Sequence, residues 1–137
     1  MPMNRALYPK NWEAIALAIK NAANWTCEEC DRPCRRPGES VDDFEERLAA
    51  DAPRWGSDLY EVVETEFGEM PLPTKIGRFT LTTAHLNHQP SDCRPENLKA
   101  WCSVCHCRYD LRAMPTKRQM RLEREGQQNL FGQGETA

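Results

Sequence analysis

Two pairs of cysteines constrain this chain more than any other feature of its sequence. In each pair two residues separate the cysteines: Cys27 and Cys30 form the first pair, and Cys102 and Cys105 form the second. This spacing lets both thiolates of a pair reach one ion from a tight turn, and two pairs complete a tetrahedral set. Four protein ligands leave no open position, so the pairs predict a structural zinc that clamps distant parts of the chain together.

The other cysteines and the N-terminus favour reduced thiols over disulfides. The chain has seven cysteines, an odd number, and it begins without a signal-peptide pattern, so we expect a cytoplasmic protein. No apolar stretch approaches the ~20 residues that a membrane span needs. Cys34, Cys93 and Cys107 are interpreted as small buried residues or free thiols, with Cys34 as an alternative zinc ligand.

An acidic insertion, residues 36–75, explains the long separation between the two cysteine pairs. Between Arg36 and Met70 the chain carries eleven acidic and three basic residues. The net charge of −3 therefore hides a basic remainder that is adequate for contact with phosphates. The insertion is interpreted as a cover for the core, a contact for a partner, or a segment that mimics or repels nucleic acid.

We expect this insertion to be helical. Ser40 and Asp43 match a capping box for a first helix, and Asp58 caps a second. Residues 70–73 then form an extended linker. The residues expected to face inward are Val41, Phe44, Leu48, Leu59, Val62, Val63 and Phe67.

The rest of the chain predicts an α+β fold. Apolar residues recur at helical spacing near the N-terminus, with Asn11 as a cap, and Leu and Thr alternate before the first histidine. The expected elements are a helix over 9–23, strands over 79–85 and 98–101, a helix from the second cysteine pair through Asp110, a break at Pro115, a helix over 116–125 and a flexible tail over 126–137.

All three histidines lie close to the second cysteine pair. They are His85, His88 and His106, and Asn97 stands between them. Three runs resemble the HNH endonuclease family: AHLNHQP at 84–90, PENL at 95–98 and WCSVCH at 101–106. The resemblance is specific from Leu81 to Asp110 and weaker back to the first cysteine pair, and it does not cover the acidic insertion.

The resemblance implies a single nuclease domain over 1–137 with a ββα-metal (His-Me finger) core and added helices. Hydrolysis of a DNA phosphodiester needs a base to activate water and a divalent ion to neutralise charge. The family pattern makes His85 the base, Asn97 the residue that orients it, and His106 a ligand of Mg²⁺ or Mn²⁺. Asp110 lies one turn further on, either as a second ligand or as an ordinary surface partner of nearby arginines.

One departure from the family pattern leaves the ligands open. Many relatives carry Asp or His immediately before the catalytic histidine, where this chain has Ala84. Asn87, which an extended strand would place on the same face as His85, or His88 is interpreted as the replacement. An alternative register makes His88 the base.

These departures motivate two further hypotheses. The chain is alternatively a non-catalytic, zinc-stapled module that binds DNA or protein, or an interaction protein whose insertion and tail carry the function. Gln127, Leu130 and Phe131 resemble the short motif with which bacterial replication proteins dock on the sliding clamp, although these residues could instead pack on the domain. Basic residues near the motif favour DNA phosphates as partners; they are Arg94, Lys99, Arg108, Arg112, Lys117, Arg118, Arg121 and Arg124.

Overall fold

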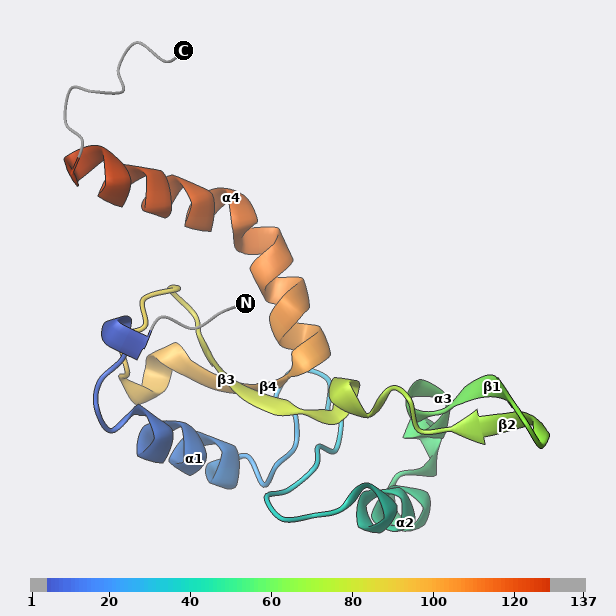
Figure 1. Ribbon diagram of the computed structural model, residues 1–137. Coiled ribbons are helices and arrows are strands. Elements are labelled where there is room, and N and C mark those ends of the chain that lie inside the picture. Colours follow the sequence, from blue (N-terminus) through green and yellow to red (C-terminus); the bar gives the residue numbers. More distant parts are fainter. Residues whose placement is uncertain (1–4, 129–137) are drawn as a thin grey trace. The chain divides into compact units, whose positions relative to one another are not determined.

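The structure is a computed structural model that describes residues 5–128, apart from the side chains of 114, 116, 117 and 126–128. The chain divides into two compact units, residues 1–106 and 107–137, and each is described by itself. Helices and two small antiparallel sheets make up the described residues, which confirms the α+β class (Figure 1). Within residues 5–128 no helix is both long and apolar enough to cross a membrane.

The histidine region is built on a two-stranded antiparallel sheet. Strand β3, Leu81–His85, pairs with strand β4, Leu98–Cys102, so that His85 lies opposite Leu98. Helix α1, Trp12–Ala22, runs alongside this sheet (Figure 1) and packs Trp12 and Ala16 against Leu98. Both strands lie where alternation predicted them. Helix α1 begins after Asn11, although the Asn11 side chain makes no capping hydrogen bond.

The first half of the insertion folds as the sequence predicts. Helix α2, Val41–Asp51, begins after Ser40, whose hydroxyl accepts a hydrogen bond from the Asp43 amide at 3.1 Å. The helix places Phe44 and Leu48 in a second apolar core together with Leu59 and Phe79. Single 3-10 turns connect the main elements; they are η1 Arg5–Leu7, η2 Pro53–Trp55, η3 Ile76–Phe79 and η4 Pro95–Asn97.

The prediction of a second insertion helix is wrong. Helix α3 covers only Gly56–Leu59, and a hairpin follows with strands β1, Glu61–Thr65, and β2, Gly68–Leu72. Val62 and Phe67, expected to face inward, are 66% and 82% exposed. The β-branched residues of β1 favour extended backbone, and Gly68 takes the positive φ of 97° that the turn requires. Asp58 lies inside α3 instead of capping a long helix.

The C-terminal helix also differs from expectation. Helix α4, Ser103–Gln128, continues through Pro115 without the predicted break. A proline inside a helix removes one backbone hydrogen bond and costs about 3 kcal/mol, but good helix formers flank it on both sides. The helix extends three residues past the predicted end, so the beginning of the predicted tail, including Gln127, is helical. Leu130 and Phe131 lie outside the described residues.

Two phenylalanines of the insertion should respond differently to truncation. Phe44 is 0% exposed, so Phe44→Ala should lower the free energy of unfolding by about 3–5 kcal/mol. Phe67→Ala, at the exposed tip of the hairpin, should change it by less than about 0.5 kcal/mol. Urea denaturation of both variants checks this, and equal losses would favour the helical insertion over the hairpin.

Candidate functional site

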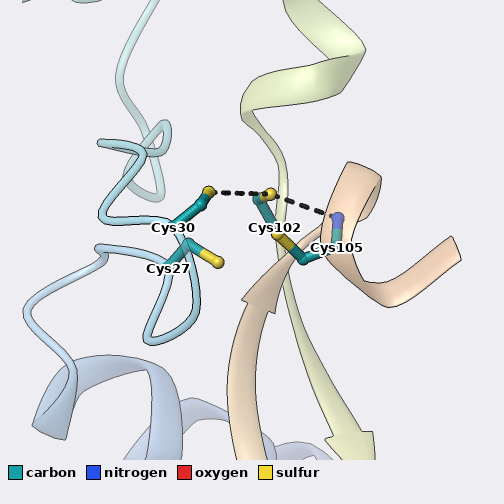
Figure 2. Close-up of side chains that lie close together, drawn as sticks. All are labelled: Cys27, Cys30, Cys102 and Cys105. Carbon is teal, nitrogen blue, oxygen red and sulfur yellow. Dashed lines mark hydrogen bonds between the residues drawn. The ribbon is translucent and has the colours of Figure 1, made fainter. Parts of the chain in front are cut away.

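The four cysteines of the two pairs lie together. Their sulfur atoms are all within 4.8 Å of one another, and the sulfurs of Cys30 and Cys102 are 3.8 Å apart. Four sulfurs at about 2.3 Å from a central zinc would be separated by about 3.8 Å. Figure 2 shows the side chains gathered around a common centre. The prediction that the pairs form one cluster is confirmed, and the cluster can hold a metal ion such as zinc.

Local backbone structure brings each pair to this centre. Cys27 and Cys30 lie in a tight turn in which the Asp31 amide donates to the Cys27 carbonyl at 3.0 Å, and Asp31 has a positive φ of 66°. Cys102 is the last residue of β4 and Cys105 lies in the first turn of α4. The Cys105 amide donates to the Cys102 sulfur at 3.4 Å, a hydrogen bond that stabilises a thiolate (Figure 2).

Glu28 attaches the first pair to the sheet. Its amide donates to the Ala100 carbonyl at 2.8 Å, and its carboxylate accepts from the Ala100 amide at 2.6 Å. Ala100 sits in the middle of β4. These two hydrogen bonds therefore satisfy its backbone amide and carbonyl on the edge of β4 that does not pair with β3. The cysteine turn is therefore fixed to β4 directly as well as through the metal position.

The thiols of this cluster hold protons that a bound metal ion must displace. A hydrogen bond with Cys102, followed by burial, raises the pKa of Cys27 to about 12, and burial is the first cause that raises the pKa of Cys105 to about 12. The same hydrogen bond lowers the pKa of Cys102. The ligand form of cysteine is the thiolate, so metal binding here releases protons.

The three other cysteines lie outside this cluster. Cys34 is fully buried and its thiol donates to the Arg32 carbonyl at 3.6 Å, which does not support it as an alternative ligand. Burial raises the pKa of Cys34 to about 12. Cys107 is exposed, and the sulfur of Cys93 lies 3.7 Å from the Nε2 atom of His85.

His85 ends strand β3 in an aromatic setting. It is 9% exposed, its ring stacks on Trp12 with centroids 4.9 Å apart, and the ring of Tyr8 meets it edge-on at 5.8 Å. Burial and the charge of His106 lower the pKa of His85, and the opposing effects of Asp92 and the Pro90 carbonyl do not reverse this. The imidazole is therefore neutral at pH 7 and keeps a lone pair.

Asn97 closes the loop between β3 and β4. It is 6% exposed, and its Nδ2 donates to the Asn87 side chain at 2.9 Å and to the Asp92 carbonyl at 2.8 Å. Its Oδ1 accepts from the Asn87 amide at 3.1 Å, and its backbone carbonyl accepts from the Leu86 amide at 2.9 Å. Asn97 thus binds both ends of the loop that follows His85.

Asn87 belongs to the same network and does not have the geometry expected of a metal ligand. Its Oδ1 accepts from Asn97 and from the Gln89 amide, each at 2.9 Å, so both lone pairs are used. Its Nδ2 donates to Asp92 at 2.7 Å. Strand β3 ends at His85, so Asn87 does not share a strand face with it as predicted. His88 lies in a turn with a φ of 59°, and its amide donates to the His85 carbonyl.

Sequence reasoning missed Asp92 as a member of this network. Its carboxylate accepts from Asn87 and forms a two-point ion pair with Arg94 at 2.7 and 2.8 Å. The hydrogen bonds with Arg94, and then those with Asn87, lower the pKa of Asp92 to about 2. The sequence signal that could have identified Asp92 is an aspartate in the same proline-containing loop as Asn87. Arg94 was expected to bind phosphate, and here its charge is paired.

His106 is oriented by a threonine of the sheet. Its Nδ1 lies 2.8 Å from the Thr82 hydroxyl, and that hydroxyl donates its one proton to the Trp101 carbonyl at 2.8 Å. Thr82 must therefore accept from the Nδ1–H of His106, which puts the lone pair of the neutral ring on Nε2. A ring N–H held in this way is typical of histidines that bind metal through the other nitrogen.

The second ion implied by the resemblance stays a prediction. Within the described part of the chain, the four cysteines are the only group of three or more His, Cys, Asp or Glu side chains spaced to hold an ion. Mg²⁺ often keeps several waters and binds through one or two protein groups plus substrate phosphates. Asp110, the other expected ligand, is half-buried in the second unit.

Metal binding by the cysteines can be measured directly. We expect one equivalent of zinc per chain, and Co²⁺ in its place should give thiolate-to-cobalt absorption. Cys102→Ser should lose the metal and lower the thermal midpoint, since the ion links the turn after α1 to β4. Cys107→Ser, at an exposed position outside the cluster, should keep both. Equal metal content in the two variants would contradict the four-cysteine site.

The comparisons with known proteins give no match. No family model matches the chain, no curated protein does, and no solved structure does. The functional proposal therefore rests on the side-chain geometry and on the resemblance of the three sequence runs to the HNH pattern.

Proposed function

We propose that this protein is a metal-dependent endonuclease of the HNH type that hydrolyses DNA phosphodiester bonds. The observation that carries the proposal is the pair of histidines on a strand–strand–helix unit: His85 ends β3, and His106 lies in the first turn of α4. The two are near enough for the charge of His106 to lower the pKa of His85. A structural zinc alone would need neither histidine.

His85 is suited to act as the general base. Its lowered pKa keeps the ring neutral at pH 7, and its Nε2 faces Cys93, whose thiol donates to the Pro90 carbonyl. A hydrogen bond from the His85 ring to the same carbonyl leaves the other ring nitrogen to accept the proton of the attacking water. Trp12 holds the ring plane, and Asn97 holds the loop that supplies the carbonyl.

His106 is suited to bind a divalent ion through Nε2. A bound Mg²⁺ or Mn²⁺ would neutralise charge on the scissile phosphate and on the leaving oxygen. The chain's own contribution is orientation: Thr82 fixes the ring through Nδ1, and Cys105, the preceding residue, would be held by a structural zinc. The zinc would thus keep the start of α4, and with it His106, at a constant distance from β3.

DNA phosphates are the expected contact for the basic residues. In the second unit α4 exposes five arginines, at 108, 112, 118, 121 and 124. Such contacts bind without reading sequence and weaken as salt rises. The Gln127, Leu130 and Phe131 motif would add docking on a sliding clamp, and this part of the proposal rests on the sequence alone.

A non-catalytic binding module is the second candidate. The observation that favours it is Asn87, whose oxygen is fully engaged in the loop network, together with Ala84 at the position where relatives carry a ligand. In that case the four-cysteine centre and the basic helix would bind DNA or protein without cutting.

The test of the enzyme is cleavage of supercoiled plasmid by zinc-loaded protein with Mg²⁺ or Mn²⁺. His85→Ala should slow nicking by about 10²–10⁴-fold, the contribution of a general base. Because the base must be neutral and its pKa is lowered, the rate should fall only as the pH drops below about 6.5. Loss with His88→Ala but not with His85→Ala would move the base to His88, and no cleavage by wild type with any divalent ion would favour the binding module.

The two adjacent threonines of β3 offer a matched pair for the role of His106. Thr82→Val removes the acceptor of the His106 Nδ1–H, and we expect it to raise the Mn²⁺ concentration needed for half-maximal nicking by about 10–100-fold. Thr83 donates to the Ala16 carbonyl instead, at 3.2 Å, so Thr83→Val should leave this concentration unchanged. The same metal dependence in both variants would remove His106 from the proposed site.

A further inference from the structure

Arg32 is a buried cation for which the proposed reaction has no use. It is 5% exposed and lies between two aromatic rings, with its guanidinium 4.6 Å from the centre of Trp55 and 4.8 Å from that of Phe79. Its Nη2 pairs with Asp58 at 2.6 Å. Its Nε and Nη1 are buried without a hydrogen-bond partner. A guanidinium with two unsatisfied nitrogens is costly unless a further anion is present.

The backbone of Arg32 belongs to the first cysteine turn. Arg32 follows Cys30 by two residues, and its carbonyl accepts from the Cys27 amide at 3.0 Å and from the Cys34 thiol at 3.6 Å. Burial acts to lower the pKa of Arg32, yet the pKa is raised. The groups that raise it are Asp58, Cys102 and Cys30. This agrees with the geometry: the backbone of Arg32 is part of the cysteine turn, and its guanidinium pairs with a carboxylate of the insertion.

Charge balance explains why a cation belongs in this position. Four thiolates around a divalent ion carry a net charge of about −2, and an uncompensated buried charge costs several kcal/mol. Arginine remains charged at every accessible pH and has five N–H donors. Asp58 does not neutralise the charge of Arg32 completely, because the same carboxylate also pairs with Arg78 at 3.1 Å.

We infer that Arg32 is the counter-cation of the four-cysteine metal centre, with its buried guanidinium compensating the charge of the sulfur ligands and its pair with Asp58 joining the centre to the insertion. The inference rests on metal binding by the cysteines and does not depend on nuclease activity. Trp55 and Phe79 belong to the core that contains Phe44 and Leu48. Loading the metal therefore stabilises α2 and its core through a single side chain.

Arg78 provides a matched control, because it also pairs with Asp58 but its side chain is 46% exposed. The full chain is titrated with Zn²⁺ against a chromophoric chelator. Arg32→Gln should weaken zinc binding by about 10–100-fold, as loss of an outer hydrogen-bonding partner does, and Arg32→Lys should weaken it less. Arg78→Gln should match wild type. Equal affinity of Arg32→Gln and wild type would overturn the inference.

A second measurement needs only the wild-type chain, in case Arg32→Gln does not fold. Amide hydrogen exchange is followed in α2 before and after addition of Zn²⁺. Slower exchange in α2 after addition supports coupling between the centre and the insertion, and unchanged exchange overturns it. If wild type binds zinc and only the Arg32 results fail, the metal centre stands without the inference. If wild type binds no zinc, both fall.

Discussion

The convergence of four sulfur atoms at the junction of β4 and α4 is the constraint on which the histidine region depends. It ties the turn after α1 to the end of the sheet, and the hydrogen bonds of Glu28 with Ala100 fix the same turn a second time. Because His106 directly follows Cys105, the direction of its ring is set by where the cluster begins the helix. The first apolar core is small, with Trp12, Ala16 and Leu98 as its buried residues, so a metal link there replaces apolar contacts that a larger core would supply.

Polar networks hold the parts that the apolar cores do not reach. The side-chain amides of Asn97 and Asn87 form hydrogen bonds within the loop that follows His85. These bonds restrict the movement of the loop relative to His85. Arg32 does the same for the insertion, with its guanidinium against the rings of Trp55 and Phe79. Asn97 and Arg32 are themselves buried, where a satisfied hydrogen bond is strong and an unsatisfied one is costly, which is why these single residues carry so much of the geometry.

The sequence predicted the features that depend on local spacing, and it failed where partners are distant. The cysteine pairs, strands β3 and β4 and the Ser40 cap each follow from a few neighbouring residues. The hairpin was missed because Val62, Val63 and Phe67 also fit helical spacing, and only the pairing with β2 decides between the two. The hydrogen bonds of Asn87 with Asn97 and Asp92 were not foreseen, because the fold brings these partners to it.

The sequence distance between the cysteine pairs also bears on how the protein is made. Cys30 and Cys102 are 72 residues apart, so during synthesis the first turn emerges well before its partners exist. The entropy of closing a loop grows only as about 1.5 RT times the logarithm of its length, but it must be met before the distant contact can form. Helix α2 and the hairpin find their partners between Phe44 and Phe79, all of which emerge before Cys102, so they can fold on the ribosome before the cysteine cluster is complete. A nascent chain that ends before Cys105 would carry a folded insertion next to an incomplete cysteine cluster. The thiols of the first pair would then be exposed to other metal ions and to oxidants.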